Sequence, residues 1–201
     1  MNFQLLLNWH LIIAAISGIL LVLGEVTYIK DTLRGEARPN AVSFFLWTVL
    51  QAIALTAQIS AGASWSVVLV FFVTLTTAFV TILAISGYGY YRYGKTDFYC
   101  FIFALVAIVL WQITGNPVLA IVFAIVGDIF ASWPTIVKTY RDPHSESLSS
   151  WGLFTVASIF GVFSTELWDA ANLAFPVYLA IISGTIFFLA YFRGGRKAGL
   201  I

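Results

Sequence analysis

The chain has 201 residues, of which 61% are hydrophobic and only 9% are charged, and its formal net charge is +1. About 25% of the residues of an ordinary soluble domain are charged, so this composition and a mean hydropathy of +0.95 exclude a soluble globular protein. The single cysteine excludes an intrachain disulfide and a thiolate metal cluster, and nothing in the charge points to nucleic-acid binding.

Apolar stretches follow one another along the whole chain and are separated by short polar connectors. A spanning helix needs about 20 apolar residues, because each adds 1.5 Å and every backbone amide must be bonded within the segment. The predicted spans are 11–29, 41–60, 64–85, 98–114, 117–137, 148–165 and 171–192. The fourth and sixth are short and would need to thin the bilayer or recruit flanking residues. The sequence thus predicts an all-α membrane protein with seven transmembrane helices.

The basic residues all fall on one side of this predicted topology. They are Lys30, Arg34, Arg38, Arg92, Lys95, Lys138, Arg141, Arg193, Arg196 and Lys197. The opposite connectors, near Gly62, Gly115 and Trp168, contain no Lys or Arg. Because positive connectors stay in the cytoplasm, we expect a multi-pass protein of the plasma (inner) membrane, with its N-terminus outside and its C-terminus in the cytoplasm.

An internal repeat divides the chain into two halves. Pro39, Ser43 and Trp47 at the start of the second predicted helix recur 104 residues later at the start of the sixth, as Pro143, Ser147 and Trp151. The same offset maps helices 1–3 onto helices 5–7. We therefore predict a parallel 3-1-3 repeat, with a first triple-helix bundle at 1–96, a linker helix at 97–116, and a second bundle with a cytoplasmic tail at 117–201.

The segment from Ser132 to Trp151 resembles the PQ-loop motif of the SWEET and PQ-loop transporter superfamily. Pro134 matches the family proline, and Thr135 stands where the family has Gln. The first helix contains no proline, so the first copy is degenerate. The resemblance implies a 3-1-3 fold that moves a small polar solute, such as a sugar or an amino acid, by alternating access. PnuC-type vitamin transporters, which share the plan in reverse orientation, are a weaker match.

Two acidic residues lie inside predicted spans, where a charge costs about 2.5–3.5 kcal/mol on insertion scales. Asp128 falls near the middle of the fifth helix, and Glu25 lies nearer the end of the first. Each is predicted to bind substrate or to couple transport to protons. The alternative is a structural carboxyl bonded to neighbouring hydroxyls. Because these are corresponding helices of the two halves, we expect both residues to face a central path.

Other candidate binding residues are polar or aromatic. Gln51 and Gln58 share one face of the second helix, and Asn172 opens the seventh; helix-to-helix hydrogen bonding is the alternative for these amides. Trp47 and Trp151 are predicted to be paired stacking platforms or gates. The alternative is that they are ordinary residues of the membrane interface. Pro134 is predicted to be a hinge, because a proline inside a helix removes a backbone hydrogen bond, with a static kink as the alternative.

These patterns favour a transporter, which would be facilitative or proton-coupled. The alternative is a receptor or sensor on the same scaffold that binds a ligand without moving it. A retinal protein is disfavoured because the seventh span has no lysine, and an enzyme because the spans lack a cluster of catalytic or metal-binding residues. We predict no cofactor and no metal, with the bilayer and a small solute as partners; self-association is left open.

Overall fold

The structure is a computed structural model that describes residues 9–60, 66–90, 94–114, 117–164, 168 and 170–197. For residues 54–60, 66–70, 117–118, 120–121, 170–172 and 195–197 it describes only the backbone. These parts are helical and contain no strand. The seven α-helices are α1 (Trp9–Leu33), α2 (Ala41–Ser60), α3 (Ser66–Leu83), α4 (Lys95–Ile113), α5 (Pro117–Arg141), α6 (Leu148–Phe163) and α7 (Ala170–Lys197). The prediction of an all-α protein is confirmed.

Short irregular turns flank two of the helices. A π-helical turn, η2 (Ala84–Tyr88), extends α3, and a 3₁₀ turn, η3 (Pro143–Ser145), precedes α6. Gly87 in η2 has φ 117°. This conformation favours glycine, because a Cβ would be strained there. The turn therefore ends the third helix with its chain directed toward the start of α4.

Five helical segments in the described part of the chain are long and apolar enough to cross a membrane. They are Trp9–Leu33, Phe71–Tyr88, Lys95–Ile113, Val122–Arg141 and Leu173–Gly194. Two shorter apolar helical segments, Ala41–Ile53 and Leu148–Phe163, accompany them. Many large apolar side chains of these helices are exposed, for example Ile113 and Ile181. Such a surface is compatible with an integral membrane protein, because hydrocarbon removes the penalty for exposing it.

Several helix ends differ from the prediction, and α4 and α5 are two examples. α4 begins at Lys95, three residues early, because the Gly94 N–H donates to Asp97 Oδ2 over 2.8 Å and caps the helix. The helix thereby recruits flanking residues, one of the two outcomes expected for a short fourth span, and its 19 residues are long enough to cross a membrane. α5 continues beyond the predicted end at residue 137 to Arg141, which places Lys138 inside the helix and not in a connector.

Both copies of the repeated motif start a helix, each through a side-chain cap. Asn40 Oδ1 accepts the backbone N–H of Val42 at 3.0 Å and caps α2. Ser147 Oγ accepts the backbone N–H of Ser150 at 3.2 Å and caps α6. Capping of this kind satisfies amides that the first helical turn leaves without partners. The caps occupy different positions of the repeated pattern: Asn40 directly follows its proline, whereas Ser147 is the repeated serine. Ser43, the counterpart of Ser147, has a buried hydroxyl without a hydrogen-bond partner among the described residues.

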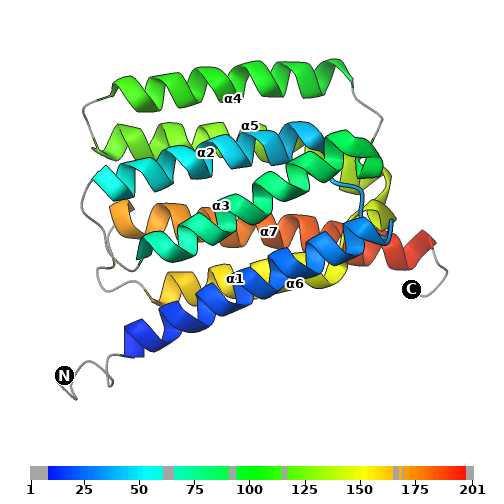
Figure 1. The fold of residues 1–201 in the computed structure, drawn as a ribbon, viewed down its shortest axis with the longest axis horizontal. Coiled ribbons are helices and arrows are strands. Elements are labelled where there is room, and N and C mark those ends of the chain that lie inside the picture. The colour runs from blue at the N-terminus through cyan, green and yellow to red at the C-terminus, as the bar shows by residue number, and fades with distance from the viewer. Residues whose placement is uncertain are drawn as a thin grey trace.

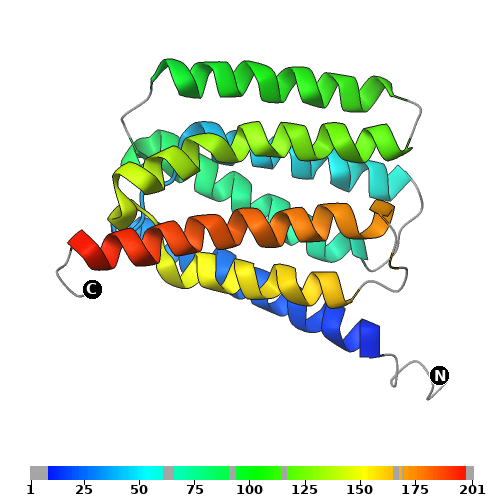
Figure 2. The same ribbon diagram turned by 180° about the vertical axis from the view of Figure 1, so that it is seen from behind.

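The helices form a bundle in which odd-numbered and even-numbered helices run in opposite directions (Figure 1). α3 packs against both α1 and α2, and α7 packs against both α5 and α6. The two sets of three meet where α1 contacts α6 and where α2 contacts α5. α4 lies at the edge of the bundle and packs mainly on α5 (Figures 1 and 2).

We call the end of the bundle at which α1, α3, α5 and α7 finish the basic end. The described basic side chains near it are Lys30, Arg34, Arg38, Lys95, Lys138, Arg141 and Arg193. An aromatic cluster packs between α1, α2 and α6 near this end, with Tyr28, Phe44 and Trp151 almost fully buried. This packing closes the interior of the bundle toward the basic end.

Candidate functional site: a central cavity

A cavity of about 550 Å³ lies in the middle of the bundle and is lined by residues from all seven α-helices. This volume falls within the range of about 300–1,000 Å³ that small-molecule sites occupy. The polar lining residues are Glu25, Gln51, Thr77, Asp128, Ser132, Ser158 and Ser183. The aromatic ones are Phe44, Trp47, Trp111, Trp151, Phe154 and Phe175.

Five of the eight residues singled out in the sequence line this cavity: Glu25, Trp47, Gln51, Asp128 and Trp151. They come from α1, α2, α5 and α6, the helices through which the two sets of three meet. The side chains of Gln58 and Asn172 lie outside the described residues. Pro134 is buried within α5 and is not among the lining residues.

Asp128 is held by hydroxyl groups from two helices. Tyr178 on α7 donates to Asp128 Oδ2 over 2.5 Å, and Ser132, one turn further along α5, donates to the same oxygen over 3.2 Å. The Trp47 side chain approaches this carboxylate as well. Asp128 is 7% exposed. The carboxylate is therefore fixed in place at the cavity wall and shares α5, α7 and α2 as its supports.

Glu25 is much less well paired. Its Oε1 lies 3.4 Å from the Thr77 hydroxyl, which has one proton and donates it over 2.8 Å to the backbone carbonyl of Val73. Its Oε2 is buried and has no hydrogen-bond partner among the described residues. A buried carboxylate oxygen without a hydrogen-bond donor carries a desolvation penalty that a hydrogen-bonded oxygen largely avoids. Glu25 thus brings unused acceptor capacity to the cavity.

Gln51 is in a similar position on α2. Its side-chain oxygen Oε1 is buried and has no hydrogen-bond partner in the described part of the chain. An interior amide oxygen without a donor is uncommon in native proteins. Helix-to-helix hydrogen bonding, the structural alternative for this residue, does not account for that oxygen.

Trp47 and Trp151 meet across the interface between the two sets of helices. Their ring centroids are 6.1 Å apart with an interplanar angle of 60°. Phe44 contacts the Trp47 ring, and Tyr28 contacts the Trp151 ring edge-on. The two tryptophans, which the sequence repeat made equivalent, form an aromatic floor on the side of the cavity that faces the basic end.

Several residues that line the cavity or hold its carboxyl groups were not predicted from sequence. Ser132 could have been found, because it lies four residues from Asp128 and hence on the same helix face. Tyr178 could not, since its hydroxyl reaches Asp128 only after α7 packs against α5. Ser158 and Ser183 donate to carbonyls of their own helices, which is the ordinary behaviour of a serine in an apolar helix.

A buried network lies between the aromatic floor and the basic end. The Lys138 ammonium pairs with Glu146 Oε1 at 2.5 Å and also donates to the backbone carbonyls of Arg38 at 2.5 Å and Ser145 at 3.1 Å. Glu146 Oε2 accepts the Tyr28 hydroxyl and the Trp151 indole N–H, both at 2.8 Å. The side chains of Lys138 and Glu146 are 1% and 0% exposed. We call Lys138, Glu146, Tyr28 and Trp151 the latch network. It ties α1, α5 and α6 together.

Backbone and side-chain contacts reinforce the latch network at the same end of the bundle. The Arg38 N–H donates to the Ser145 carbonyl over 2.8 Å, and Ser147 Oγ donates to the Asp31 carboxylate. The first bond joins the connector before α2 to the turn before α6, and the second joins the last turn of α1 to the start of α6. The basic end is therefore closed by packed aromatic rings and by a hydrogen-bonded layer beyond them.

Pro134 lies in α5 between the cavity and the latch network. It follows Asp128 by six residues and precedes Lys138 by four, and the helix continues through it to Arg141. Figure 2 shows the last part of α5 turning away from the line of its earlier turns. A proline at this place removes one backbone hydrogen bond and pushes the preceding turn aside, so it accounts for the bend.

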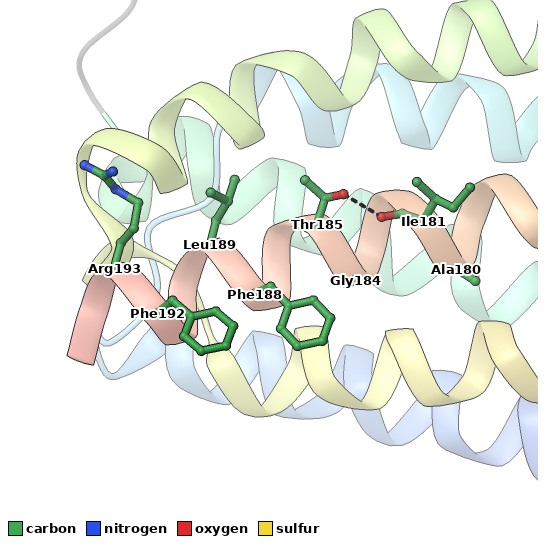
Figure 3. Close-up of a pocket in the computed structure, with 8 residues that line it drawn as sticks. All are labelled: Ala180, Ile181, Gly184, Thr185, Phe188, Leu189, Phe192 and Arg193. Carbon is green, nitrogen blue, oxygen red and sulfur yellow. Dashed lines mark hydrogen bonds between the residues drawn. The ribbon is translucent and has the colours of Figure 1, made fainter. Parts of the chain in front are cut away.

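A second depression, of about 500 Å³, lies on the outer surface of α7 and is lined from Ala180 to Arg193 (Figure 3). Its apolar side chains, such as Phe188 and Phe192, are about half exposed. Its one hydroxyl, on Thr185, donates to the Ile181 carbonyl of its own helix over 2.7 Å. Its charged lining residue, Arg193, donates from Nε to the Tyr140 carbonyl over 2.9 Å. The groove is otherwise apolar, which is compatible with a surface facing lipid.

No family model matches the chain, and neither a curated protein nor a solved structure shows significant similarity to it. The resemblance to the PQ-loop motif therefore stays a prediction that depends on the residues from Ser132 to Trp151.

Proposed function

We propose that the protein is a membrane transporter that moves a small polar solute through the central cavity by alternating access. In this proposal all seven α-helices span the bilayer, α1–α3 and α5–α7 are parallel repeats, and α4 is the linker. The observation that carries it is the meeting of Trp47 and Trp151, equivalent in the sequence repeat, at 6.1 Å across the interface beside a cavity. Binding at an interface between repeats is typical of transporters with this plan.

The packing of the helices supports the repeat. In each half the third helix packs against the first and the second, and the first helix of each half contacts the second helix of the other. A twofold relation between the halves produces this exchange of contacts. α4 stands outside it, as a linker should, because it packs mainly on α5.

The orientation follows from charge. In the proposed topology the basic end faces the cytoplasm, because Lys and Arg in short connectors are retained there. The aromatic floor and the latch network then close the cytoplasmic side of the cavity. Opening toward the cytoplasm requires α5 and α6 to part from α1, so that the hydrogen bonds between Glu146 and Tyr28 break.

Pro134 is suited to be the hinge for this motion. It separates Asp128, in the cavity wall, from Lys138, in the latch network, within one helix. Bending at Pro134 moves Lys138 relative to Asp128 without unfolding α5, because the backbone hydrogen bond there is already missing. Hinges of this kind need only a few residues.

Transport is tested by counterflow into liposomes that contain the purified full-length protein, with labelled sugars, amino acids, amines and vitamins. Uptake of at least one solute is expected, with loss on Asp128→Asn and little change on Glu36→Gln, which neutralises an exposed acid outside the cavity. No counterflow of any solute, together with unchanged binding by Asp128→Asn, would contradict the proposal.

The same liposomes separate the remaining alternatives. A proton-coupled transporter accumulates solute when a pH gradient is imposed, and a facilitative one does not. A receptor on this fold binds its ligand saturably and shows no counterflow.

A further inference from the structure

We infer that the cavity recognises an organic cation, a protonated amine or a quaternary ammonium carried on an apolar or aromatic body. This inference names the solute class of the proposed transporter, and so it depends on the cavity being the transport site. It comes from three independent properties of the cavity: its charge, its hydrogen-bonding groups and its aromatic faces.

The ionisable groups of the cavity wall are acidic. Glu25 and Asp128 both line it, and both are 7% exposed. The described lining contains no Lys, Arg or His. The nearest described basic residue of α5, Lys138, is bound to Glu146 and to two carbonyls beyond the aromatic floor. A buried carboxyl must either be protonated or be compensated by a positive charge, and no described side chain directs a cation into the cavity.

The hydroxyl groups of the wall have already donated their protons. The hydroxyl protons of Thr77, Ser158 and Ser183 are given to carbonyls of their own helices, and that of Ser132 is given to Asp128. The indole N–H of Trp151 is given to Glu146. What these groups leave for a ligand is lone pairs.

Two acceptor atoms of the lining that lack hydrogen-bond partners support the same inference. Glu25 Oε2 and Gln51 Oε1 are buried, and neither has a partner among the described residues. Both are acceptors. A ligand that supplies N–H donors and positive charge would satisfy them at once, whereas an anion would add repulsion to two carboxylates.

Aromatic rings and aliphatic side chains supply the rest of the surface. The described lining includes three tryptophans, Trp47, Trp111 and Trp151. The face of a tryptophan is the strongest of the natural aromatic partners for a cation. The same rings pack well against an apolar body, so one ligand can use both properties.

Other solute classes fit less well. A sugar could donate hydroxyls and stack on the rings, but it would leave both carboxylates without a compensating charge. A metal ion is disfavoured, because the described residues contain no group of three or more His, Cys, Asp or Glu side chains that could hold one. The cavity volume of about 550 Å³ is also that of a molecule and not of an ion.

The test uses the purified full-length protein and three ligands that share one body: tyramine, which is cationic, tyrosol, which is neutral, and 4-hydroxyphenylacetate, which is anionic. Further amine, alcohol and carboxylate sets with other bodies extend the panel, and glucose represents the sugars. Binding is measured by the change in tryptophan fluorescence and by thermal shift, since a ligand that binds only the folded state raises its stability.

We expect the amines to bind at least about tenfold more tightly than the alcohols and carboxylates of the same body. Glu25→Gln should remove most of that preference. Glu36→Gln, which removes an exposed acid of the same charge, should leave it intact.

Three results overturn the inference: equal binding within every set, tighter binding of the carboxylates, or an amine preference that survives Glu25→Gln and Asp128→Asn together. Failure of the transport proposal gives a different set of results. Amine binding without counterflow would remove transport and keep the inference, and glucose counterflow without amine preference would do the reverse.

Discussion

Removing the positive charge of the latch network should destabilise the protein strongly. In Lys138→Met, the Glu146 carboxylate keeps its bonds from Tyr28 and Trp151 but loses the only cation that contacts it in the described structure. Breaking a buried pair by removal of one partner costs about 3–5 kcal/mol, because the remaining charge is uncompensated. For a chain of this size, 1 kcal/mol lowers Tm by about 2–4 °C, so Tm should fall by about 6–20 °C.

A second substitution should recover much of that loss. In the double variant Lys138→Met/Glu146→Gln, the latch network no longer contains a buried charge. The glutamine oxygen can still accept a hydrogen bond from the Trp151 indole. Replacing both members of a buried pair is far less costly than replacing one. We therefore expect the double variant to be more stable than Lys138→Met alone. Lys30→Met is the control, because this exposed lysine at the end of α1 should change the stability by less than about 1 kcal/mol.

Thermal unfolding of the purified protein in detergent, followed by circular dichroism, measures the wild type, Lys138→Met, Glu146→Gln, the double variant and Lys30→Met under one condition. If Lys138→Met is no less stable than Lys30→Met, Lys138 is solvated and the latch network does not exist as described. If the double variant is as unstable as the sum of the single losses, Lys138 and Glu146 do not interact, and additivity of separate sites applies.

The latch network should also control access to the cavity from the basic end. Ser183→Cys, in a Cys100→Ser background, places one thiol in the cavity lining. Lys138→Met/Glu146→Gln should raise the rate at which a membrane-impermeant maleimide labels this thiol from the basic side, because the double variant lacks the ion pair that holds α5 to the connector before α6. An unchanged labelling rate would show that the aromatic floor alone closes this side.

Two further changes test how the cavity is built. In Gly24→Ala the new Cβ would lie 2.5 Å from Phe154 Cε1, so the ring must move into the cavity; overpacking of about 1–3 kcal/mol should appear as binding of tyramine weakened about 5- to 100-fold, measured by fluorescence titration. Gly184→Ala, whose Cβ makes an ordinary contact at 3.6 Å, is the control, and equal losses would refute the reasoning. Tyr178→Phe removes the hydroxyl that donates to the α5 carboxylate over 2.5 Å and should cost about 1.5–3 kcal/mol in thermal unfolding, whereas the exposed Tyr191→Phe should cost almost nothing.

The positions of the helices could be predicted because the signals are local. A run of apolar residues is helical in a bilayer wherever it lies, since each amide must be bonded within its own segment. The helix starts also carry local signals, because Asn40 and Ser147 each cap the helix that follows. The exact helix ends were less predictable. α4 begins early through a cap supplied by Asp97, and α5 continues through Pro134 to Arg141.

The candidate site was predictable only in part. Asp128, Glu25 and Gln51 could be singled out, because polar groups are rare in apolar helices and their cost is a property of the residue. Which bonds they make was not predictable. Lys138 was read as a topological charge at the end of a span, but burial and the approach of Glu146 make it a structural residue.

The sequence by itself determined an all-helical chain with an apolar surface, one basic side, and polar residues at a few buried depths, because composition and spacing act within one helix. Only the tertiary structure decided that Tyr178 reaches Asp128, that Trp47 meets Trp151, and that Glu25 and Gln51 keep unpaired acceptors beside a cavity. Those facts depend on which helices pack together. Helices distant in sequence, such as α1 and α6, are chosen by side-chain fit across the bundle, which no single segment contains.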